Sequence, residues 1–388
     1  MNKTDSKWTK LIQPDFVKND NFKSLADSIE RASTIVFDDV SKLRNRNWKD
    51  KHSYSYGLMG TPTSRRLEKQ IAIIENVKHA ILFPSGLSAI TCFLISFLVS
   101  GDKVLFPSNV YGPVIDFANF LKERFGIDYD LYDPINPDNL RISPNTKLVW
   151  VETPGSVTME VSDLYLIARV AHENGALVAV DSTWSAGIAL PVFELGADIS
   201  VQALTKYQSG GSDVLMGSLS TNSDSIYLKL SESIMKLGVG VSQADCHLIL
   251  RSLPHYPLRY HAQDNSARRI ANWLNSSKSI EKVLHPAIPG SIGHNIWKKY
   301  FTASASLFSV VFKKDFEQEK IDAFVNALRL FRIGFSWGGA VSLVVPYTKD
   351  QLHKNFPFEG SLVRFYIGLE QADDLINDLD QALTKILN

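Results

Sequence analysis

Lys206 is the side chain in this sequence whose surroundings point most directly to chemistry. It follows an apolar run at residues 199–204 and precedes a small, polar, glycine-rich segment at residues 207–213. A lysine at the end of a buried strand is poorly hydrated, which disfavours the ammonium form and frees the amine to attack an aldehyde. The sequence therefore predicts a lysine able to form a Schiff base, although most lysines at strand ends are simply solvated.

Asp181 is a second candidate because an apolar run at residues 177–180 ends at its carboxylate. Two interpretations fit the local sequence. Asp181 can form a turn with the backbone of Ser182 and Thr183, or it can be a buried anion that needs a cationic partner such as a protonated heterocycle. Because Asp181 and Lys206 each follow a predicted strand, we expect both to face one pocket.

Residues 84–89 (PSGLSA) follow an apolar run and open a predicted helix, which makes them a candidate anion site. Unpaired backbone N–H groups at a helix start attract phosphate, and Gly86 allows a close approach. The alternative is plain capping of the helix by Ser85. The Thr205 hydroxyl, next to Lys206, is a second candidate phosphate ligand. The sequence has no P-loop pattern, so a nucleoside triphosphate is not indicated.

Three further segments carry candidate ligand-binding side chains. Tyr111 follows a predicted strand, where its ring can stack on a flat ligand or pack beneath its own loop. Arg364 lies inside a predicted strand, so its guanidinium either binds a carboxylate bidentately or points to solvent from an edge strand. Ser336 and Trp337 precede two glycines and form either a pocket wall or a packed loop.

The elements that must position these residues alternate between short apolar strands and helices. Strands are expected at residues 103–106, 148–151, 177–180 and 199–204, and helices at 64–76, 87–99, 114–125 and 163–174. This alternation predicts an α/β fold, in which a mostly parallel sheet is covered by helices on both faces. In such sheets the chemistry gathers at the carboxyl ends of the strands.

After about residue 250 the pattern predicts a smaller α+β C-terminal domain. Helices are expected at 261–275, 317–331 and 372–387, and strands at 307–312, 341–345 and 362–367. We therefore divide the chain into an N-terminal arm (1–55), a large domain (56–250) and a C-terminal domain (251–388). The arm has one possible helix near residues 22–32, and the turn-rich residues 253–257 are the expected hinge.

Composition narrows the classes of partner. The 388 residues are 45% hydrophobic and 21% charged, and 41 basic residues balance 41 acidic ones. A net charge of zero gives no electrostatic case for nucleic acid or an anionic membrane, so a small molecule is the expected partner. Two cysteines without metal-ligand spacing suit a reducing cytoplasm and predict neither a disulfide nor a metal site. The N-terminus lacks the apolar core of a signal peptide, and no run is long enough to span a bilayer.

Together these segments resemble the Cys/Met-metabolism family of pyridoxal-phosphate enzymes of fold type I. The matching phrases, in the family's order, are YGLMGTPT at 56–63, ETPGS at 152–156, VDSTW at 180–184 and TKY at 205–207. Three phrases resemble the family's cystathionine β-lyases more than its γ-synthases and γ-lyases: PGSVTMEV at 154–161, DSTWSAG at 181–187 and SWGG at 336–339. The resemblance implies a large sheet of seven-stranded type and pyridoxal 5'-phosphate as the cofactor.

The resemblance also implies a role for each candidate residue. Lys206 would hold the cofactor as a Schiff base, remove the substrate's Cα proton and help to expel the thiol. Asp181 would keep the pyridine nitrogen protonated, and Tyr111 would stack on the ring; Lys206 and Tyr111 are the expected catalytic residues. The phosphate would be held by Ser85, Gly86, Leu87 and Thr205. The substrate's α-carboxylate would be held by Arg364, helped by Ser336 and Trp337.

The implied reaction is β-elimination of L-cystathionine to L-homocysteine, pyruvate and ammonia. The alternatives are another activity of the same family, namely a γ-synthase, a γ-lyase or a β-lyase for other cysteine conjugates, and a binding protein without catalysis. Family members are usually homotetramers built from dimers, so Tyr56 would reach the phosphate of the neighbouring subunit, and an arm at residues 1–55 would suit that interface.

Two positions depart from the family pattern. An arginine that commonly contacts the phosphate is replaced by Leu58, which removes one cationic contact. A glutamate usually found near the carboxylate pocket is replaced by Val341. These differences leave the identity of the thioether substrate less constrained than the identity of the cofactor.

Overall fold

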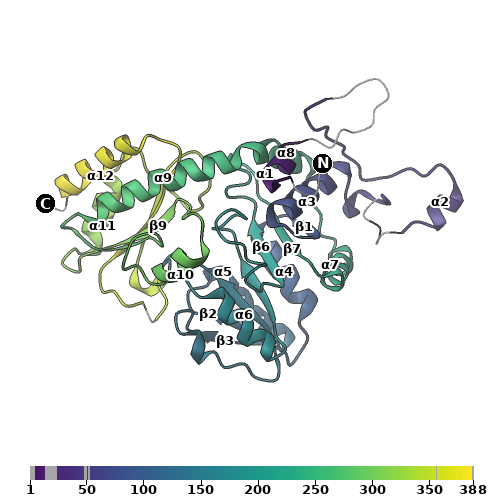
Figure 1. Ribbon diagram of the computed structural model, residues 1–388, viewed down its shortest axis with the longest axis horizontal. Helices are drawn as coiled ribbons and strands as arrows, with labels where there is room; N and C mark the ends of the chain where they lie inside the picture. Colours follow the sequence, from purple (N-terminus) through teal and green to yellow (C-terminus); the bar gives the residue numbers. More distant parts are fainter. Residues whose placement is uncertain (1–4, 14–23, 48–49, 51–52, 355, 387–388) are drawn as a thin grey trace.

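The computed structural model describes residues 5–13, 24–47, 50, 53–354 and 356–386. Its strands form two separate sheets, each in its own lobe (Figure 1). The larger sheet has seven strands in the order β1-β7-β6-β5-β4-β2-β3. These strands are β1 (His79–Phe83), β2 (Lys103–Pro107), β3 (Asp128–Tyr132), β4 (Thr146–Glu152), β5 (Leu177–Asp181), β6 (Ile199–Ala203) and β7 (Gly217–Thr221).

The large sheet is mostly parallel, which confirms the predicted fold class. Only β7 runs antiparallel to its neighbours, β1 and β6. The carboxyl ends of β1, β2, β4, β5 and β6 therefore meet at one edge. Every predicted site residue of the large lobe except Tyr56 lies at the end of one of these strands or in the segment after it.

Helices cover both faces of this sheet because alternate strand residues are apolar on each side. One face packs against α4 (Gly86–Phe97), α5 (Gly112–Phe125) and α7 (Asp224–Leu237). The other packs against α3 (Pro62–Glu75), α6 (Leu164–Glu173) and α8 (Gln243–Ser252). Within β5, for example, Val178 and Val180 belong to the second core and Ala179 to the first. Such two-sided burial is typical of parallel sheets.

The second sheet has the order β10-β11-β12-β9-β8. Its face toward the C-terminal helices buries Phe308, Val363 and Phe365, whereas its other face joins the core of the large lobe through Val345 and Leu362. β12 is thus a central strand. The elements are α9 (Tyr256–Asn275), β8 (Ile280–Leu284), α10 (His294–Tyr300), β9 (Leu307–Phe312), α11 (Gln318–Ala327), β10 (Arg332–Ile333), β11 (Leu343–Tyr347), β12 (Leu362–Tyr366) and α12 (Ala372–Ile386).

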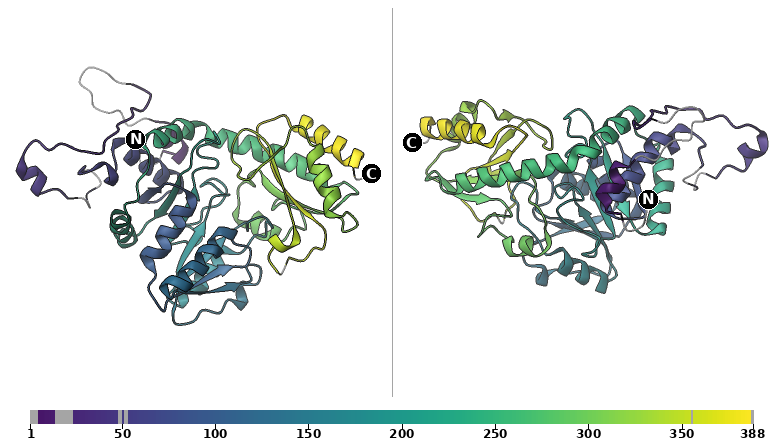
Figure 2. Two further views of the ribbon diagram at one scale, coloured as in Figure 1. Left: turned by 180° about the vertical axis from the view of Figure 1, so that it is seen from behind. Right: turned by 45° about the horizontal axis from the view of Figure 1, so that its top comes forward.

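The expected turn-rich hinge at residues 253–257 is wrong. A 3₁₀ segment, η3 (Leu253–His255), leads from α8 straight into α9, which runs along both lobes (Figures 1 and 2). Pro254 and Pro257 each stand in the first turn of a helical segment, where a missing N–H is tolerated. The predicted division between residues 250 and 251 falls within α8 and stays a prediction.

The N-terminal segment contains two short helices, α1 (Lys7–Ile12) and α2 (Val40–Arg44). α1 lies on the large lobe, where the Lys7 amine donates hydrogen bonds to the carbonyls of Ile74 and Gly187. α2 lies on an extension that projects from the body (Figure 2). The possible helix near residues 22–32 is wrong for residues 24–32, which have no helical structure, and residues 22 and 23 lie outside the described part.

Three short 3₁₀ segments complete the described structure: η1 (Gly57–Met59), η2 (Pro137–Asn139) and η4 (Lys349–Gln351). In the described part of the chain, no helix combines the length and the apolar character needed to cross a membrane.

Candidate active site

Lys206 lies in a tight turn three residues beyond the end of β6, and its side chain points at the loop between β10 and β11. Its Nζ donates a hydrogen bond to Ser336 Oγ at 2.8 Å and lies 5.4 Å from the centre of the Trp337 ring. Burial and the nearby Arg364 charge lower the pKa of Lys206 from 10.5 to about 8, against an opposing effect of Asp181. The amine is thus partly unprotonated near neutral pH.

The loop that contacts Lys206 approaches it too closely for a side chain at Gly338. A Cβ atom there would lie 2.4 Å from the Lys206 carbonyl carbon, and Gly338 has a φ of +92°. The next residue, Gly339, accepts a hydrogen bond from Gln263 Nε2 at 2.7 Å through its carbonyl. Because Gln263 belongs to α9, this hydrogen bond holds the loop against the long helix. Ser336 and Trp337 therefore form a wall of the site.

Asp181 is the last residue of β5 and faces the same edge. Its carboxylate accepts the Thr183 N–H at 3.0 Å, while the Thr183 hydroxyl accepts the Ala203 N–H at 2.9 Å. Asp181 therefore forms the expected turn and is also a carboxylate in a largely buried position. Burial raises its pKa, whereas the bond from Thr183 and the charge of Lys206 act in the opposite direction.

Glu152 is a site residue to which the sequence analysis gave no role. It ends β4 and pairs in register with Asp181 of β5, so the two carboxyl groups are neighbours. Burial, followed by the charge of Asp181, raises the pKa of Glu152 well above 4.5. The signal that identified Asp181, a carboxylate at the end of an apolar strand, applies equally to Glu152.

Tyr111 precedes α5 and is tied to β4, because its backbone N–H donates to Glu152 Oε2 at 2.8 Å. Its side chain is 44% exposed, so it does not pack beneath its own loop. Burial of the remaining part raises the pKa of Tyr111, and the charges of Asp181 and Glu152 add to this effect. The ring is consequently free to cover a flat ligand.

The start of α4 leaves backbone N–H groups open to an anion. Ser85 Oγ caps the helix by accepting the Ser88 N–H at 3.0 Å, but the N–H groups of Gly86 and Leu87 have no acceptor in the described residues. A Cβ on Gly86 would lie 2.7 Å from Ala203 Cβ, so only glycine lets α4 approach β6 this closely. The Thr205 hydroxyl bonds to the backbone N–H and carbonyl of Met216, at 3.0 and 3.2 Å.

Arg364 lies on the central strand β12 and is only 9% exposed, so the edge-strand alternative is wrong. Within the described ranges its side chain has no ion pair and no hydrogen bond, and its guanidinium carbon lies 5.5 Å from the centre of the Tyr347 ring. Burial lowers its pKa. A buried cation without a protein counter-ion indicates a binding place for an anionic ligand.

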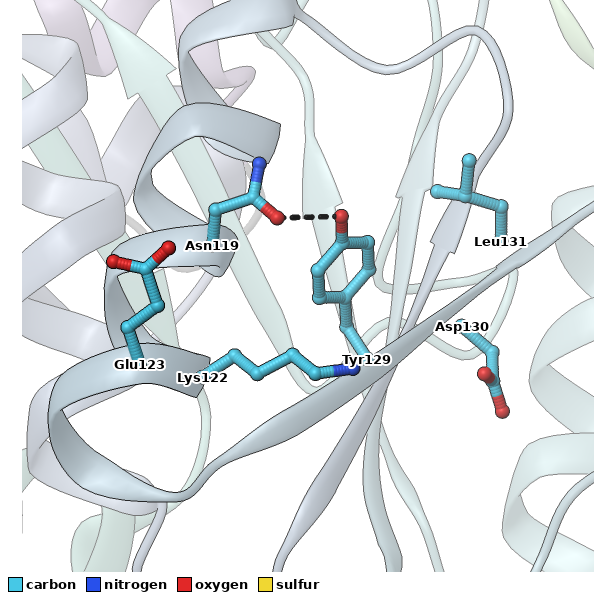
Figure 3. Close-up of a pocket in the computed structure, with 6 residues that line it drawn as sticks. All are labelled: Asn119, Lys122, Glu123, Tyr129, Asp130 and Leu131. Carbon is cyan, nitrogen blue, oxygen red and sulfur yellow. Dashed lines mark hydrogen bonds between the residues drawn. The ribbon is translucent and has the colours of Figure 1, made fainter.

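Two predicted positions stand apart from this cluster. Tyr56 is 53% exposed at the start of η1, and no described interaction links it to Lys206 or to the start of α4. Val341 is 49% exposed in the loop before β11. A separate surface hollow, lined by Asn119, Lys122, Glu123, Tyr129, Asp130 and Leu131, lies between α5 and β3 and contains none of the predicted site residues (Figure 3).

The donor set fits pyridoxal 5'-phosphate. The Lys206 amine suits its aldehyde, the open N–H groups at the start of α4 suit its phosphate, and Asp181 suits its ring nitrogen. Tyr111 supplies an exposed aromatic face for the ring. Arg364 is a cation that this set leaves open for a further anionic group.

Comparisons with known proteins agree with this geometry. The family model described as "Cys/Met metabolism PLP-dependent enzyme" matches residues 8–384. Cystathionine beta-lyase MetC of Escherichia coli is 34% identical over 390 residues, with 98% of both chains covered. An L-alanine/L-glutamate racemase of Wolbachia pipientis is 33% identical over 381 residues, covering 95% of this chain and 94% of the relative.

Among solved structures, the crystal structure of metB from Corynebacterium glutamicum superposes with a TM-score of 0.89 at 26% identity, covering 98% of both chains. The family model therefore spans nearly the whole chain, and a solved structure shares its fold from end to end. The chain belongs to the Cys/Met metabolism family of enzymes that depend on pyridoxal 5'-phosphate.

Proposed function

We propose that this enzyme is a carbon–sulfur β-lyase that converts L-cystathionine and water to L-homocysteine, pyruvate and ammonia. The observation that carries the proposal is the buried Arg364, which has no counter-ion among the described residues and whose charge is close enough to Lys206 to lower its pKa. A cation beside a reactive amine suits an α-amino acid, which presents a carboxylate next to the Cα–H bond. The relative named cystathionine beta-lyase supports the choice of thioether.

The chain's own residues supply binding and proton transfer. Bound pyridoxal phosphate, held by Ser85, Gly86, Leu87 and Thr205, supplies an electron sink for the charge that develops at Cα. Lys206 removes the Cα proton and delivers a proton to the departing sulfur; a pKa of about 8 suits both directions of transfer. Asp181 holds a proton on the ring nitrogen. Arg364, with Ser336 and Trp337, holds the carboxylate so that the Cα–H bond faces the amine.

A product assay tests the reaction type. Purified holoenzyme incubated with L-cystathionine should release homocysteine and pyruvate in equal amounts. Release of cysteine and 2-oxobutyrate instead would show γ-cleavage and overturn the assignment. A panel of smaller cysteine thioethers, run in parallel, separates a dedicated cystathionine enzyme from a general cysteine-conjugate β-lyase.

Covalent trapping tests the assignment of Lys206. Borohydride reduction of the holoenzyme should fix the cofactor on the peptide that contains Lys206, as read by mass spectrometry. Lys206→Ala should lose this adduct and lower kcat by at least about 100-fold, the usual lower range for removing a general acid–base group. An adduct that persists in the variant would show that another lysine carries the cofactor.

A second candidate is racemisation of an amino acid, favoured by the relative named L-alanine/L-glutamate racemase. The same groups would bind the substrate, and Cα would be reprotonated without loss of a side-chain group. Incubation with L-alanine or L-glutamate followed by chiral chromatography distinguishes this activity. D-enantiomer formation faster than cystathionine cleavage would make racemisation the primary activity.

We also propose a homotetramer, a dimer of dimers in which Tyr56 completes the phosphate site of a neighbouring subunit. Its exposure, without a described contact to the site of its own chain, supports this arrangement. Inactive Tyr56→Ala and Lys206→Ala proteins, mixed and reassembled, should regain activity because some sites then carry both native residues. Failure of the mixed protein to recover activity would place Tyr56 outside the neighbouring site.

A further inference from the structure

Tyr347 is a buried aromatic residue beside Arg364 that the proposed function does not use. It ends β11, which pairs antiparallel with β12 so that Val345 lies opposite Arg364 and Tyr347 opposite Leu362. Residues two apart on a strand share a face, so Tyr347 and Arg364 lie on the same side of the sheet. That side is continuous with the core of the large lobe, since Val345, Tyr347 and Leu362 belong to it.

The Tyr347 ring packs near the guanidinium group of Arg364. Its centre is 5.5 Å from the guanidinium carbon, within the range of a cation–π contact. A planar guanidinium held by an aromatic ring already has little rotational freedom, so less conformational entropy is lost when it binds a planar carboxylate. Tyr347 therefore restricts the orientation of the only side chain proposed to hold the substrate's carboxylate through a charge.

The hydroxyl of Tyr347 is available to a ligand. Although the residue is only 9% exposed, the hydroxyl has no hydrogen-bond partner among the described residues. In the described part of the chain, this unpaired hydroxyl and the three unpaired nitrogens of Arg364 are not sealed from solvent. These atoms thus reach accessible surface while their side chains are otherwise buried. Burial raises the pKa of Tyr347, which keeps the hydroxyl protonated as a donor.

We propose that Tyr347 is a specificity-determining residue of the carboxylate site. Its ring orients the Arg364 guanidinium, and its hydroxyl donates a hydrogen bond to the carboxylate that Arg364 binds. The inference rests on the proposed role of Arg364 and adds a neutral donor to it. When an uncharged amide replaces the carboxylate, both the Arg364 guanidinium and the Tyr347 hydroxyl lose a charged acceptor. A site with both donors therefore selects a free carboxylate over an amide more strongly than a site with the cation alone.

A double comparison of protein and substrate tests this. The holoenzyme is assayed with S-ethyl-L-cysteine and with its carboxamide, and the ratio of the two kcat/KM values measures selection for the carboxylate. Tyr347→Phe keeps the ring and removes the hydroxyl, so it should lower this ratio about tenfold, mainly through KM. Tyr347→Leu also removes the ring and should lower it further. Tyr129→Phe is the matched control, because that hydroxyl bonds to Asn119 in the separate surface hollow (Figure 3).

A binding measurement removes the dependence on turnover. Glycine titrated into the holoenzyme by calorimetry should bind more weakly to Tyr347→Phe and unchanged to Tyr129→Phe. Arg364→Met distinguishes the role proposed for Tyr347 from the role proposed for Arg364. If it abolishes the selection while Tyr347→Phe leaves both the ratio and glycine binding unchanged, the inference about Tyr347 is overturned and the proposed function stands. If Arg364→Met leaves the selection unchanged, the carboxylate site itself is misassigned and both fail.

Discussion

Glu152 and Asp181 stand opposite each other at the ends of neighbouring parallel strands, β4 and β5, so two carboxyl groups share the edge of the sheet that holds Lys206. Only Asp181 is close enough to Lys206 for the lysine charge to lower its pKa. Glu152 instead experiences burial and the charge of Asp181, which both raise its pKa. Neighbouring carboxyl groups without enough positive charge between them do not both ionise. The Lys206 charge therefore favours ionisation of Asp181 over ionisation of Glu152.

Glu152→Gln should be tolerated, because glutamine imitates the protonated acid and its carbonyl can still accept the Tyr111 N–H. Because the pKa of Glu152 is raised well above 4.5 on folding, the folded chain keeps this proton to a higher pH than the unfolded chain does, so wild-type stability falls as pH rises above about 4.5. Glutamine does not titrate, so the Glu152→Gln variant lacks this fall in stability with rising pH. In urea titrations of the cofactor-free proteins, the stability of the variant relative to wild type should increase from pH 4.5 to pH 7.

Glu152→Ala is the comparison variant, since it removes the acceptor for the Tyr111 N–H. It should lower kcat/KM more than Glu152→Gln does. A Glu152→Gln protein that is less stable than wild type at pH 7 but equal to it at pH 4.5 would mean that Glu152 is ionised in the folded state.

Much of the site could be predicted because it depends on local patterns. Lys206, Asp181 and Tyr111 each follow an apolar strand, and alternating strands and helices bring such ends to one edge. Ser85 and Gly86 begin a helix, a local signal of an anion site. Local patterns do not show which strands pair. The sequence near Tyr347 does not indicate that its strand lies beside the strand of Arg364, because the pairing of β11 with β12 is set by tertiary packing.

Two errors in the sequence analysis have specific physical causes. Pro254 and Pro257 make residues 253–257 look turn-rich, yet each occupies the first turn of a helical segment, where proline fits. Residues 24–32 do not form a helix because their polar groups bind α3 instead. The Glu30 N–H donates to Thr63 Oγ1 at 2.8 Å, and Arg66 pairs with Asp27 at 2.7 Å.

Lys206→Met should change how stability depends on pH. In the cofactor-free protein the pKa of Lys206 is lowered from 10.5 to about 8, so between these values the unfolded chain binds more protons than the folded one. Wild-type stability therefore rises with pH across that window, by linkage. Methionine does not titrate, so the stability of wild type relative to the variant should increase from pH 8 to pH 10. A constant difference in urea midpoints, at fixed protein concentration, would contradict the lowered pKa.

Arg364→Met should separate function from stability. Without its guanidinium the substrate's carboxylate has no charged partner, so KM should rise about 30-fold or more, as expected for one side of a charged hydrogen-bonded pair. The empty protein should be no less stable than wild type, because the variant removes a buried cation that has no counter-ion among the described residues. A clear loss of urea stability with unchanged KM would indicate a structural role for Arg364 instead.

Gly338→Ala should damage both stability and activity, since its Cβ would lie 2.4 Å from the Lys206 carbonyl carbon and its φ is +92°. We expect a loss of about 2 kcal/mol or more from overpacking and backbone strain, and a displaced Ser336 that no longer holds the Lys206 amine. Gly112→Ala is the matched control, because no atom lies within 4 Å of its Cβ position at the start of α5. The control should keep wild-type stability and kcat, and equal urea midpoints for both variants would show that the loop yields to a methyl group.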